Sequence, residues 1–140
     1  MKSKKTISLR TINNTDMQFL FELLKQRDHH TNISHKKMPT FEEHQKFIKS
    51  KPYSKWYIIL RLKERIGSIY LSKNDEIGIF ISKDFQGTNI GKTALAEIIK
   101  RNPRKHYLAN VNPKNKKSIK FFKNNKFKLI QYTFELDLTS

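Results

Sequence analysis

The stretch that decides the fold is Phe85-Gln86-Gly87-Thr88-Asn89-Ile90-Gly91-Lys92. It lies between an apolar run at 77–81 and an amphipathic run at 92–101, so we expect a strand, a glycine-bearing turn and a helix. Glycine lets the backbone approach a ligand closely, and the N–H groups and dipole at the start of a helix favour an anion. The spacing excludes a P-loop and lacks the third glycine of a dinucleotide fingerprint. The stretch therefore predicts a phosphate-binding turn of another class.

A second informative stretch, at 112–127, reads Asn-Pro-Lys-Asn-Lys-Lys-Ser-Ile-Lys-Phe-Phe-Lys-Asn-Asn-Lys-Phe. Together the two stretches resemble motifs A and B of the GCN5-related N-acetyltransferase (GNAT) family. Motif A reads (Arg/Gln)-x-x-Gly-x-(Gly/Ala), where Gln86 and Gly91 match and Asn89 replaces the first glycine. Asn tolerates a positive φ better than other non-glycine residues, so we interpret this departure as a mild one.

Motif B of the family reads Asn-x-x-(Ala/Ser)-x-x-(Phe/Leu)-(Tyr/Phe)-x-x-x-Gly-Phe. The residues of this chain that fall in register with it are Asn115, Ser118, Phe121, Phe122 and Phe127, while Lys126 replaces the glycine. Two motifs in the correct order, with a strand-like run between them, make the resemblance specific.

Periodicity and turn signals predict the order βααβββαβαβ, which resembles the complete order of the GNAT family. A helix that starts at Thr40, with Glu43 completing a capping box, should end before Pro52. The other expected elements are strands at 5–12, 56–60, 66–71, 77–81 and 107–111, a final strand or two over 127–138, and helices at about 92–101 and 115–124. An amphipathic helix is also expected where Met17, Leu20, Phe21 and Leu24 follow one another at helical spacing. The resemblance implies an α/β (α+β) fold in one domain, 1–140, with a mixed, mostly antiparallel sheet, a splayed V between two strands and about four helices.

The composition limits the classes of protein to which the chain can belong. The chain has 140 residues, 36% of them hydrophobic, and no apolar run reaches the roughly 18 residues that span a bilayer. We therefore expect a cytoplasmic protein with no membrane association. The chain contains no cysteine, which excludes disulfides, zinc held by cysteine and a cysteine nucleophile.

The net charge is +17, from 29 Lys and Arg against 12 Asp and Glu. Such a field would suit nucleic acid or a phosphorylated ligand, whereas a purely compositional origin would give basic residues dispersed along the chain. The basic residues are dispersed, so nucleic acid is the weaker interpretation. The densest segment, 114–128, coincides with motif B, where the resemblance places the phosphorylated end of coenzyme A.

The resemblance implies that acetyl-coenzyme A is the co-substrate and that no metal is required. It assigns the pantetheine arm to the backbone at Phe80, Ile81 and Ser82, where one N–H would polarise the acetyl carbonyl. The pyrophosphate would lie on the backbone from Gly87 to Lys92. The expected cofactor-binding residues are Phe80, Ile81, Ser82, Gln86, Gly87, Thr88, Asn89, Ile90, Gly91, Lys92, Asn115 and Phe122.

The catalytic residues are less clearly marked. The family's usual general acid is a Tyr, and Phe122 occupies its position here, so Tyr132 and Ser118 are the alternative donors. Glu76 begins the strand before motif A, where related enzymes often place a carboxylate base. His29, His30 and His35 lie in the loop that would cover the acceptor, and a His side chain with a pKa near ~6.5 could act as a base or bind the acceptor.

The acceptor should be a small molecule with a primary amine. The segment from Pro39 to Ile48 contains Glu-His-x-x-Phe, and it resembles a subgroup that acetylates nucleotide-linked amino sugars. Two alternatives remain: a protein or peptide N-acetyltransferase, and a non-enzymatic nucleic-acid-binding member of the same fold. The sequence is compatible with a monomer or a homodimer.

Overall fold

A computed structural model describes residues 7–27, 38–87 and 89–139 of the chain. Four strands form one antiparallel sheet in the order β1-β2-β3-β4. The strands are β1 (Ile7–Thr11), β2 (Lys55–Arg61), β3 (Glu64–Leu71) and β4 (Ile77–Ile81). The helices are α2 (Met17–Lys25), α3 (Phe41–Lys49), α4 (Ile90–Arg101) and α5 (Lys116–Asn124), with 3-10 turns η1 (Asn14–Asp16) and η2 (Lys83–Phe85).

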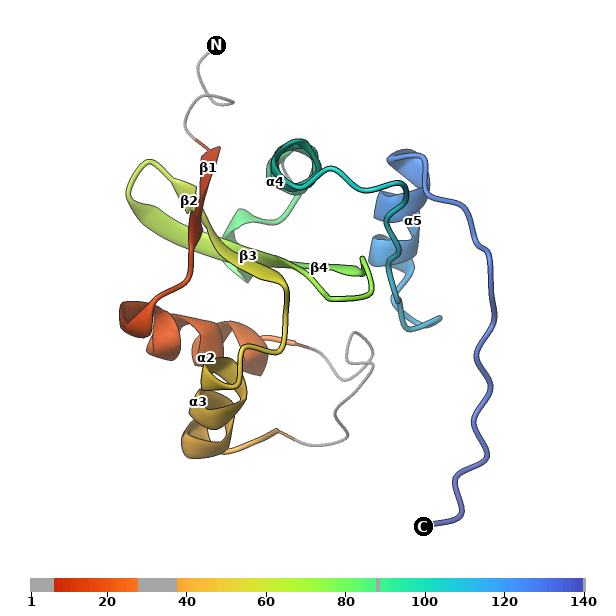
Figure 1. Ribbon diagram of the computed structural model, residues 1–140, viewed down its shortest axis with the longest axis horizontal. Helices are drawn as coiled ribbons and strands as arrows, with labels where there is room; N and C mark the ends of the chain where they lie inside the picture. The colour runs from red at the N-terminus through yellow and green to blue at the C-terminus, as the bar shows by residue number, and fades with distance from the viewer. Residues whose placement is uncertain (1–6, 28–37, 88, 140) are drawn as a thin grey trace.

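The sheet is covered on both faces, by α4 on one and by α2 and α3 on the other (Figure 1). Neighbouring side chains of β2 show the division, because side chains alternate between the faces of a strand. Ile59 belongs to the cluster that includes α4, and Ile58 to the cluster that includes α2 and α3. Both side chains are fully buried, so they fix the register of the central strands.

The predicted capping box is present at the start of α3. The hydroxyl of Thr40 accepts a hydrogen bond from the N–H of Glu43 at 3.1 Å, and the Glu43 carboxylate accepts one from the N–H of Thr40 at 2.8 Å. The helix ends at Lys49, before Pro52, as the sequence predicts. Strands β1 to β4 and helices α2, α4 and α5 likewise lie within a few residues of their predicted bounds.

Two predicted strands are absent from the described part of the chain. The strand predicted at 107–111 has one isolated parallel bridge, between Glu76 and Leu108. The strand predicted at 127–138 is extended chain without strand pairing, and it runs along the outer side of α5 (Figure 1). Alternating apolar residues give a segment the preference for a strand but do not supply a partner, and neither segment has a ladder here.

The predicted V lies where β4 and the segment 107–112 diverge. The N–H of Ile77 donates to the C=O of Leu108 at 2.7 Å, and the N–H of Leu108 donates to the C=O of Asp75 at 2.8 Å. Beyond this point no backbone hydrogen bond joins the two segments within the described residues. A cavity is lined by both of them, so the V opens onto a site.

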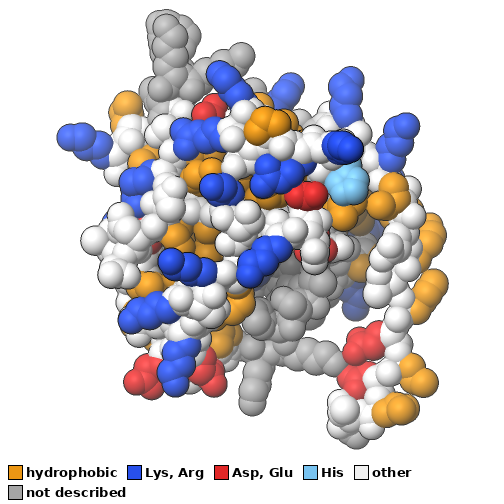
Figure 2. All heavy atoms as spheres, in the orientation of Figure 1, with side chains coloured by type: hydrophobic (Ala, Val, Ile, Leu, Met, Phe, Trp, Pro, Cys, Tyr) orange, Lys and Arg blue, Asp and Glu red, His pale blue; other side chains and the backbone are white. Residues whose placement is uncertain are grey.

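The surface in Figure 2 carries Lys and Arg side chains spread over most of the visible face. Among the described residues, no helix combines the length and the apolar character that crossing a bilayer requires.

Candidate active site

A cavity of about 680 Å³ occupies the V and continues to both sides of the sheet edge. One side is lined by α2, α3 and neighbouring aromatic residues. The other is lined by the turn before α4, the segment 110–112 and α5. This gives two compartments that meet at β4, which is the arrangement that a transfer between two substrates requires.

The start of α4 forms one end of the cavity. Gly87 has φ +84° and lines the cavity, as do Ile90 and Gly91. No side chain caps the helix at Asn89, and the N–H groups of Gly91 and Lys92 make no hydrogen bond within the described part of the chain. Polarised N–H groups at a helix start fit a pyrophosphate, so the residues present suit coenzyme A.

Asn89 does not adopt the backbone conformation that the sequence comparison predicts for it. Asn89 has φ −84°, so it does not use the positive φ that would have explained its replacement of a glycine. Gly87 supplies the left-handed residue of the turn instead. Asn89 and Lys92 do not line the cavity with their side chains, and Thr88 lies outside the described residues.

Packing leaves little room for a side chain at Gly91. A Cβ added there would lie 3.1 Å from the Phe121 ring. This distance is shorter than ordinary van der Waals contact, so any larger residue must displace Phe121 of α5. Gly91 thus keeps the start of α4 close to the motif B helix.

The backbone of β4 offers hydrogen-bond donors to the cavity. In an antiparallel pair, alternate residues direct their N–H groups to the partner strand. The N–H of Ser82 donates to Ile66 on β3 at 2.9 Å, whereas that of Ile77 donates to Leu108 across the V. By this alternation, Ile79 and Ile81 direct their N–H groups into the V. Ser82 and, by the same alternation, Phe80 direct their N–H groups to β3, so Ile79 joins the predicted Ile81 as a backbone donor that faces the V.

The remaining predicted contacts to coenzyme A surround this backbone. Phe80, Ile81, Gln86, Asn115 and Phe122 all line the cavity. The side-chain N–H of Gln86 donates to the C=O of Ile81 at 2.9 Å, which joins the turn to the end of β4. Asn115 caps α5 by accepting from the N–H of Ser118 at 3.2 Å, which explains why motif B begins with an Asn.

Glu76 lies where the two arms of the V meet and lines the cavity. Its carboxylate accepts hydrogen bonds from the Ser72 hydroxyl at 3.1 Å and from the Asn110 side-chain amide at 2.9 Å. Asn110 lies on the opposite arm, so this contact joins the two arms near the point where they meet. Sequence reasoning could not find Asn110, because 34 positions separate it from its partner.

The other predicted catalytic residues divide between the cavity and the surface. Ser118 lines the cavity, near Phe122 of the same helix. Tyr132 lies on the C-terminal extended segment, 75% exposed and outside the cavity lining, so the structure does not bring it to the site. The predicted substrate-binding residues His29, His30 and His35 lie outside the described residues.

Aromatic residues that the sequence did not single out form the second compartment. The rings of Tyr53 and Tyr70 stack with centroids 3.7 Å apart, and Trp56 packs edge-on against Tyr53. Burial raises the pKa of the Tyr53 hydroxyl, and the neighbouring Tyr70 raises it further. A Cβ on Gly78 would overlap the Tyr70 ring, so this glycine allows Tyr70 to lie across β4.

Arg27 is the cation of this compartment. Its guanidinium lies over the Phe80 ring, 3.7 Å from the centroid, and it lines the cavity. Desolvation lowers the pKa of Arg27, while Tyr70 and Tyr53 act in the opposite direction.

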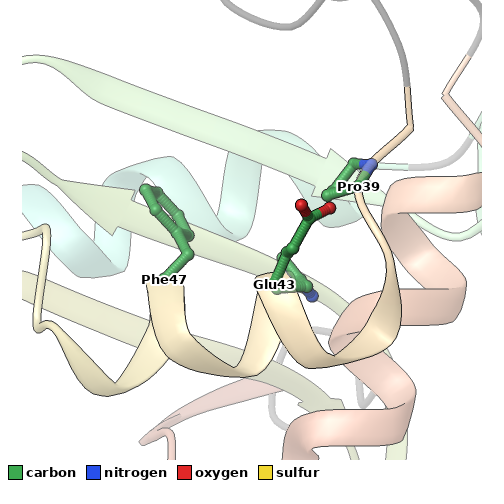
Figure 3. A pocket seen from close by; sticks show the side chains of 4 residues that line it. Pro39, Glu43 and Phe47 are labelled. Carbon is green, nitrogen blue, oxygen red and sulfur yellow. The ribbon is translucent and has the colours of Figure 1, made fainter.

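A hollow of about 230 Å³ adjoins the compartment at the start of α3 and is lined by Pro39, Glu43, His44 and Phe47 (Figure 3). His44 and Phe47 also line the larger cavity, so this helix forms part of both walls. His44 is buried, and its ring stacks with that of Phe47 at a centroid distance of 6.3 Å. The Glu-His-x-x-Phe segment therefore reaches the site through its His and Phe.

Residues 6–128 match the model of the acetyltransferase (GNAT) domain family. The chain belongs to this family. It is an N-acetyltransferase that uses acetyl-coenzyme A. Within the described residues, no group of three or more His, Cys, Asp or Glu could hold a metal ion.

Solved structures share the fold. A domain from Methanocaldococcus jannaschii DSM 2661 is 25% identical, with a TM-score of 0.81 and 92% of each chain covered. RimL, a ribosomal L7/L12 alpha-N-protein acetyltransferase in complex with coenzyme A, is 19% identical, with a TM-score of 0.71 and coverage of 90% of this chain and 82% of that chain. The Vibrio cholerae spermidine/spermine N-acetyltransferase SpeG is 15% identical, with a TM-score of 0.64 and coverage of 87% and 78%. A search of curated protein sequences finds no match.

Proposed function

We propose that this acetyltransferase acts on a primary amine whose carrier also bears an anionic group. The observation that carries the proposal is Arg27, which lines the acceptor compartment and makes no side-chain hydrogen bond or ion pair within the described part of the chain. A desolvated guanidinium without a counter-ion is costly, and its fork of donors matches a carboxylate or a phosphate. An anion on the acceptor would supply the missing partner.

A nucleotide-linked amino sugar meets this description through its diphosphate, and it remains the specific acceptor that we propose. Sugar amines beside hydroxyl groups are less basic than a Lys side chain, whose pKa is ~10.4, so more of the amine is neutral at pH 7. The related structures suggest two other classes, a protein α-amino group and a polyamine. A polyamine carries only positive charge and would be repelled by Arg27.

For the chemistry, we propose that the N–H groups of Ile79 and Ile81 bind the acetyl carbonyl and pantetheine, because alternation directs them into the V. One such donor typically contributes ~3–4 kcal/mol to stabilisation of an oxyanion. Glu76 takes the proton of the amine, directly or through a water molecule. Phe122 cannot donate a proton, so Ser118 is the proposed hydroxyl donor near the leaving thiolate.

The test is acetyl transfer to a panel of amino-sugar nucleotides, peptides with free N-termini and polyamines, in wild-type protein and in Arg27→Gln. Loss of a charge-assisted pair costs roughly 1.5–3 kcal/mol, so kcat/KM for anionic acceptors should fall about 10- to 100-fold. Lys25→Gln is the matched control, because it removes a cation of α2 that is paired with Glu22 and does not line the cavity. Turnover of polyamines alone, or equal losses in the two variants, would contradict the anionic acceptor.

A further inference from the structure

The glycine at position 78 brings the phenol of Tyr70 onto β4. Tyr70 of β3 pairs with Gly78 of β4, so their side-chain positions share one face of the sheet. That face is the one covered by α2 and α3, because Trp56, the β2 partner of Tyr70, packs against the cluster of these helices. The atoms nearest to a Cβ built on Gly78 are outer ring carbons and the hydroxyl oxygen of Tyr70. The hydroxyl therefore lies against the backbone of β4.

The same face of β4 carries the other polar groups of the proposed chemistry. Glu76, Gly78 and Phe80 alternate with residues that pack toward α4, so they share this face. Successive residues on one face of a strand are about 6–7 Å apart, so Gly78 lies that far from Glu76 and from Phe80. The guanidinium of Arg27 covers the Phe80 ring. The Tyr70 phenol thus lies between the proposed base and the cation of the compartment.

The acetyl group should lie beside this phenol. The N–H of Ile79, the residue after Gly78, is directed into the V, where it is proposed to bind the acetyl carbonyl. An amine that comes from the side of α2 and α3 must reach this carbonyl at the edge of β4, and reacting atoms need to approach within about 3–3.5 Å. The side chain that covers β4 at this point is that of Tyr70. Its hydroxyl is therefore next to the path of the amine.

Packing explains the ring of Tyr70 but not its hydroxyl. The ring stacks on that of Tyr53 with centroids 3.7 Å apart, and a phenylalanine would stack as well. Buried tyrosine hydroxyls usually have a hydrogen-bond partner, and that of Tyr57 accepts from the side chain of Asn102 at 3.2 Å. Tyr70 instead meets the phenol of Tyr53 and lines the cavity. A hydroxyl oxygen has two lone pairs, so a bond from Tyr53 leaves one of them for a ligand.

We infer that the Tyr70 hydroxyl accepts a hydrogen bond from the acceptor amine and orients the nitrogen lone pair toward the acetyl carbon. This role rests on the proposed function, which places the amine on the side of α2 and α3. The nitrogen bonds to the acetyl carbon, the carbon–sulfur bond breaks with its electron pair on sulfur, and the proton released from nitrogen goes to Glu76. Tyr70 gains and loses no proton. Phe122 lacks the phenol of motif B, and Tyr70 supplies one from the other side of β4 for a different task.

The charge of Arg27 makes this position favour the neutral amine. Desolvation lowers the pKa of Arg27, and Tyr70 and Tyr53 oppose this change, so both phenols lie beside the guanidinium. A nearby cation disfavours an ammonium group on the acceptor. A phenol oxygen has no negative charge to offset this repulsion, whereas a carboxylate would have one. The amine that Tyr70 binds is therefore in the form that can attack.

The first test uses S-carboxymethyl-coenzyme A N-methylamide, a probe that carries a carbonyl and an amide nitrogen on the donor itself. Calorimetric titration into the wild type, Tyr70→Phe and Tyr57→Phe should show the probe bound about three- to tenfold more weakly by Tyr70→Phe alone, as expected for one neutral hydrogen bond. Tyr57→Phe is the matched control, because its hydroxyl lies on the α4 side of the sheet. Acetyl-coenzyme A should bind all three within twofold.

Equal affinity of the probe for Tyr70→Phe and the wild type overturns the inference, as does an equal loss of affinity for acetyl-coenzyme A. A wild type that does not bind the probe overturns it as well. The amide side of the probe carries no anion, so these results do not depend on the anionic acceptor proposed for Arg27.

The second test displaces the phenol without removing it. A Cβ on Gly78 overlaps the Tyr70 ring, so Gly78→Ala should weaken binding of the probe about as much as Tyr70→Phe does. The double variant should lose no more than the larger single loss, because both changes remove the same contact. Additive losses would show that the two positions act independently and would overturn the inference.

Turnover separates this inference from the proposed function. With amino-sugar nucleotides, peptides and polyamines, Tyr70→Phe should lower kcat/KM for every amine that is accepted by a similar factor of about tenfold. Arg27→Gln should act on anionic acceptors alone. If Arg27→Gln shows no such selectivity while Tyr70→Phe lowers every value, the anionic acceptor is wrong and the inference stands. If Tyr70→Phe leaves kcat/KM unchanged, the inference is wrong whatever Arg27→Gln does.

Discussion

At the scale of single residues, Glu76 is the group on which the proposed chemistry depends most. It is held by Ser72 and Asn110 where the two arms of the V meet, and it lines the cavity. Replacement by Gln keeps the size of the side chain and removes its ability to take a proton. We expect kcat to fall by roughly 10²- to 10⁴-fold.

The affinity of Glu76→Gln for acetyl-coenzyme A should stay within threefold of the wild type, which separates loss of the base from loss of the site. Glu64→Gln, at the exposed start of β3, is the control for loss of one carboxylate. Steady-state kinetics over a range of pH gives both values. Unchanged turnover in Glu76→Gln would assign the base to another residue.

Asp16 shows how one buried carboxylate joins three parts of the fold. It is fully buried and accepts hydrogen bonds from Arg10 on β1, from the N–H of Asn13 and from Arg65 on β3. Desolvation raises the pKa of Asp16, but these hydrogen bonds outweigh it and hold the pKa below its ordinary value. The ionised form is therefore the one that stabilises the native state.

Because the folded pKa of Asp16 is depressed, its contribution is present above the unfolded pKa of ~3.9 and is lost as pH falls through that value toward the folded pKa. Asp16→Asn should lower the free energy of unfolding at pH 7 by roughly 2–4 kcal/mol. The difference from the wild type should shrink below about pH 4. Urea unfolding at several pH values measures it, with exposed Asp84→Asn as control. A difference that is constant with pH would show that the charge is not the cause.

At the scale of elements, local signals explain which parts of the fold the sequence could predict. Helix α3 carries its own capping box, and β2 to β4 carry alternation with short turns, so each is specified within a few residues. The segments 107–111 and 127–138 have the same alternation but no ladder within the chain. Strand propensity is a local property, whereas strand pairing depends on a partner.

The site residues also divide into those marked by local sequence and those that depend on contacts between distant segments. Gln86, Gly91 and Asn115 line the cavity, and the sequence could single them out because motifs fix their spacing. Arg27 and Asn110 were missed because their roles arise from contacts that only the folded chain creates, with Phe80 and with Glu76.

The end of α5 allows the cost of a positive φ at a helix C-terminus to be measured. Lys126 occupies the motif position of a glycine and adopts φ +74°, which costs a non-glycine residue about 1–2 kcal/mol. Lys126→Gly should therefore raise the free energy of unfolding by about 1 kcal/mol. Lys123→Gly, inside the last turn of the same helix, should lower it by about 1 kcal/mol. Thermal and urea unfolding measure both. Destabilisation by Lys126→Gly would show that the side chain makes a more important contact there.

At the scale of the whole molecule, the cavity lies where one pair of segments diverges, and its lining comes from both sides of β4. Strands β1 and β4 form the two edges of the sheet. The cavity lies beside β4, where the segment 107–112 diverges from that strand. The charge of +17 favours the anionic donor, and its spread over the surface provides a general field. Family, cavity and helix start agree on the same donor, acetyl-coenzyme A.

The most direct test of this account is calorimetric titration of acetyl-coenzyme A into the wild type, Gly91→Val and Ala96→Val. Gly91 lines the cavity at the start of α4 and lies against Phe121, whereas Ala96 is exposed on the same helix and does not line the cavity. We predict one site per chain in the wild type, at least tenfold weaker binding in Gly91→Val and unchanged binding in Ala96→Val. Circular dichroism must show that both variants are folded. Absence of binding in the wild type, or undiminished affinity in folded Gly91→Val, would contradict the assignment of the donor site to the turn before α4.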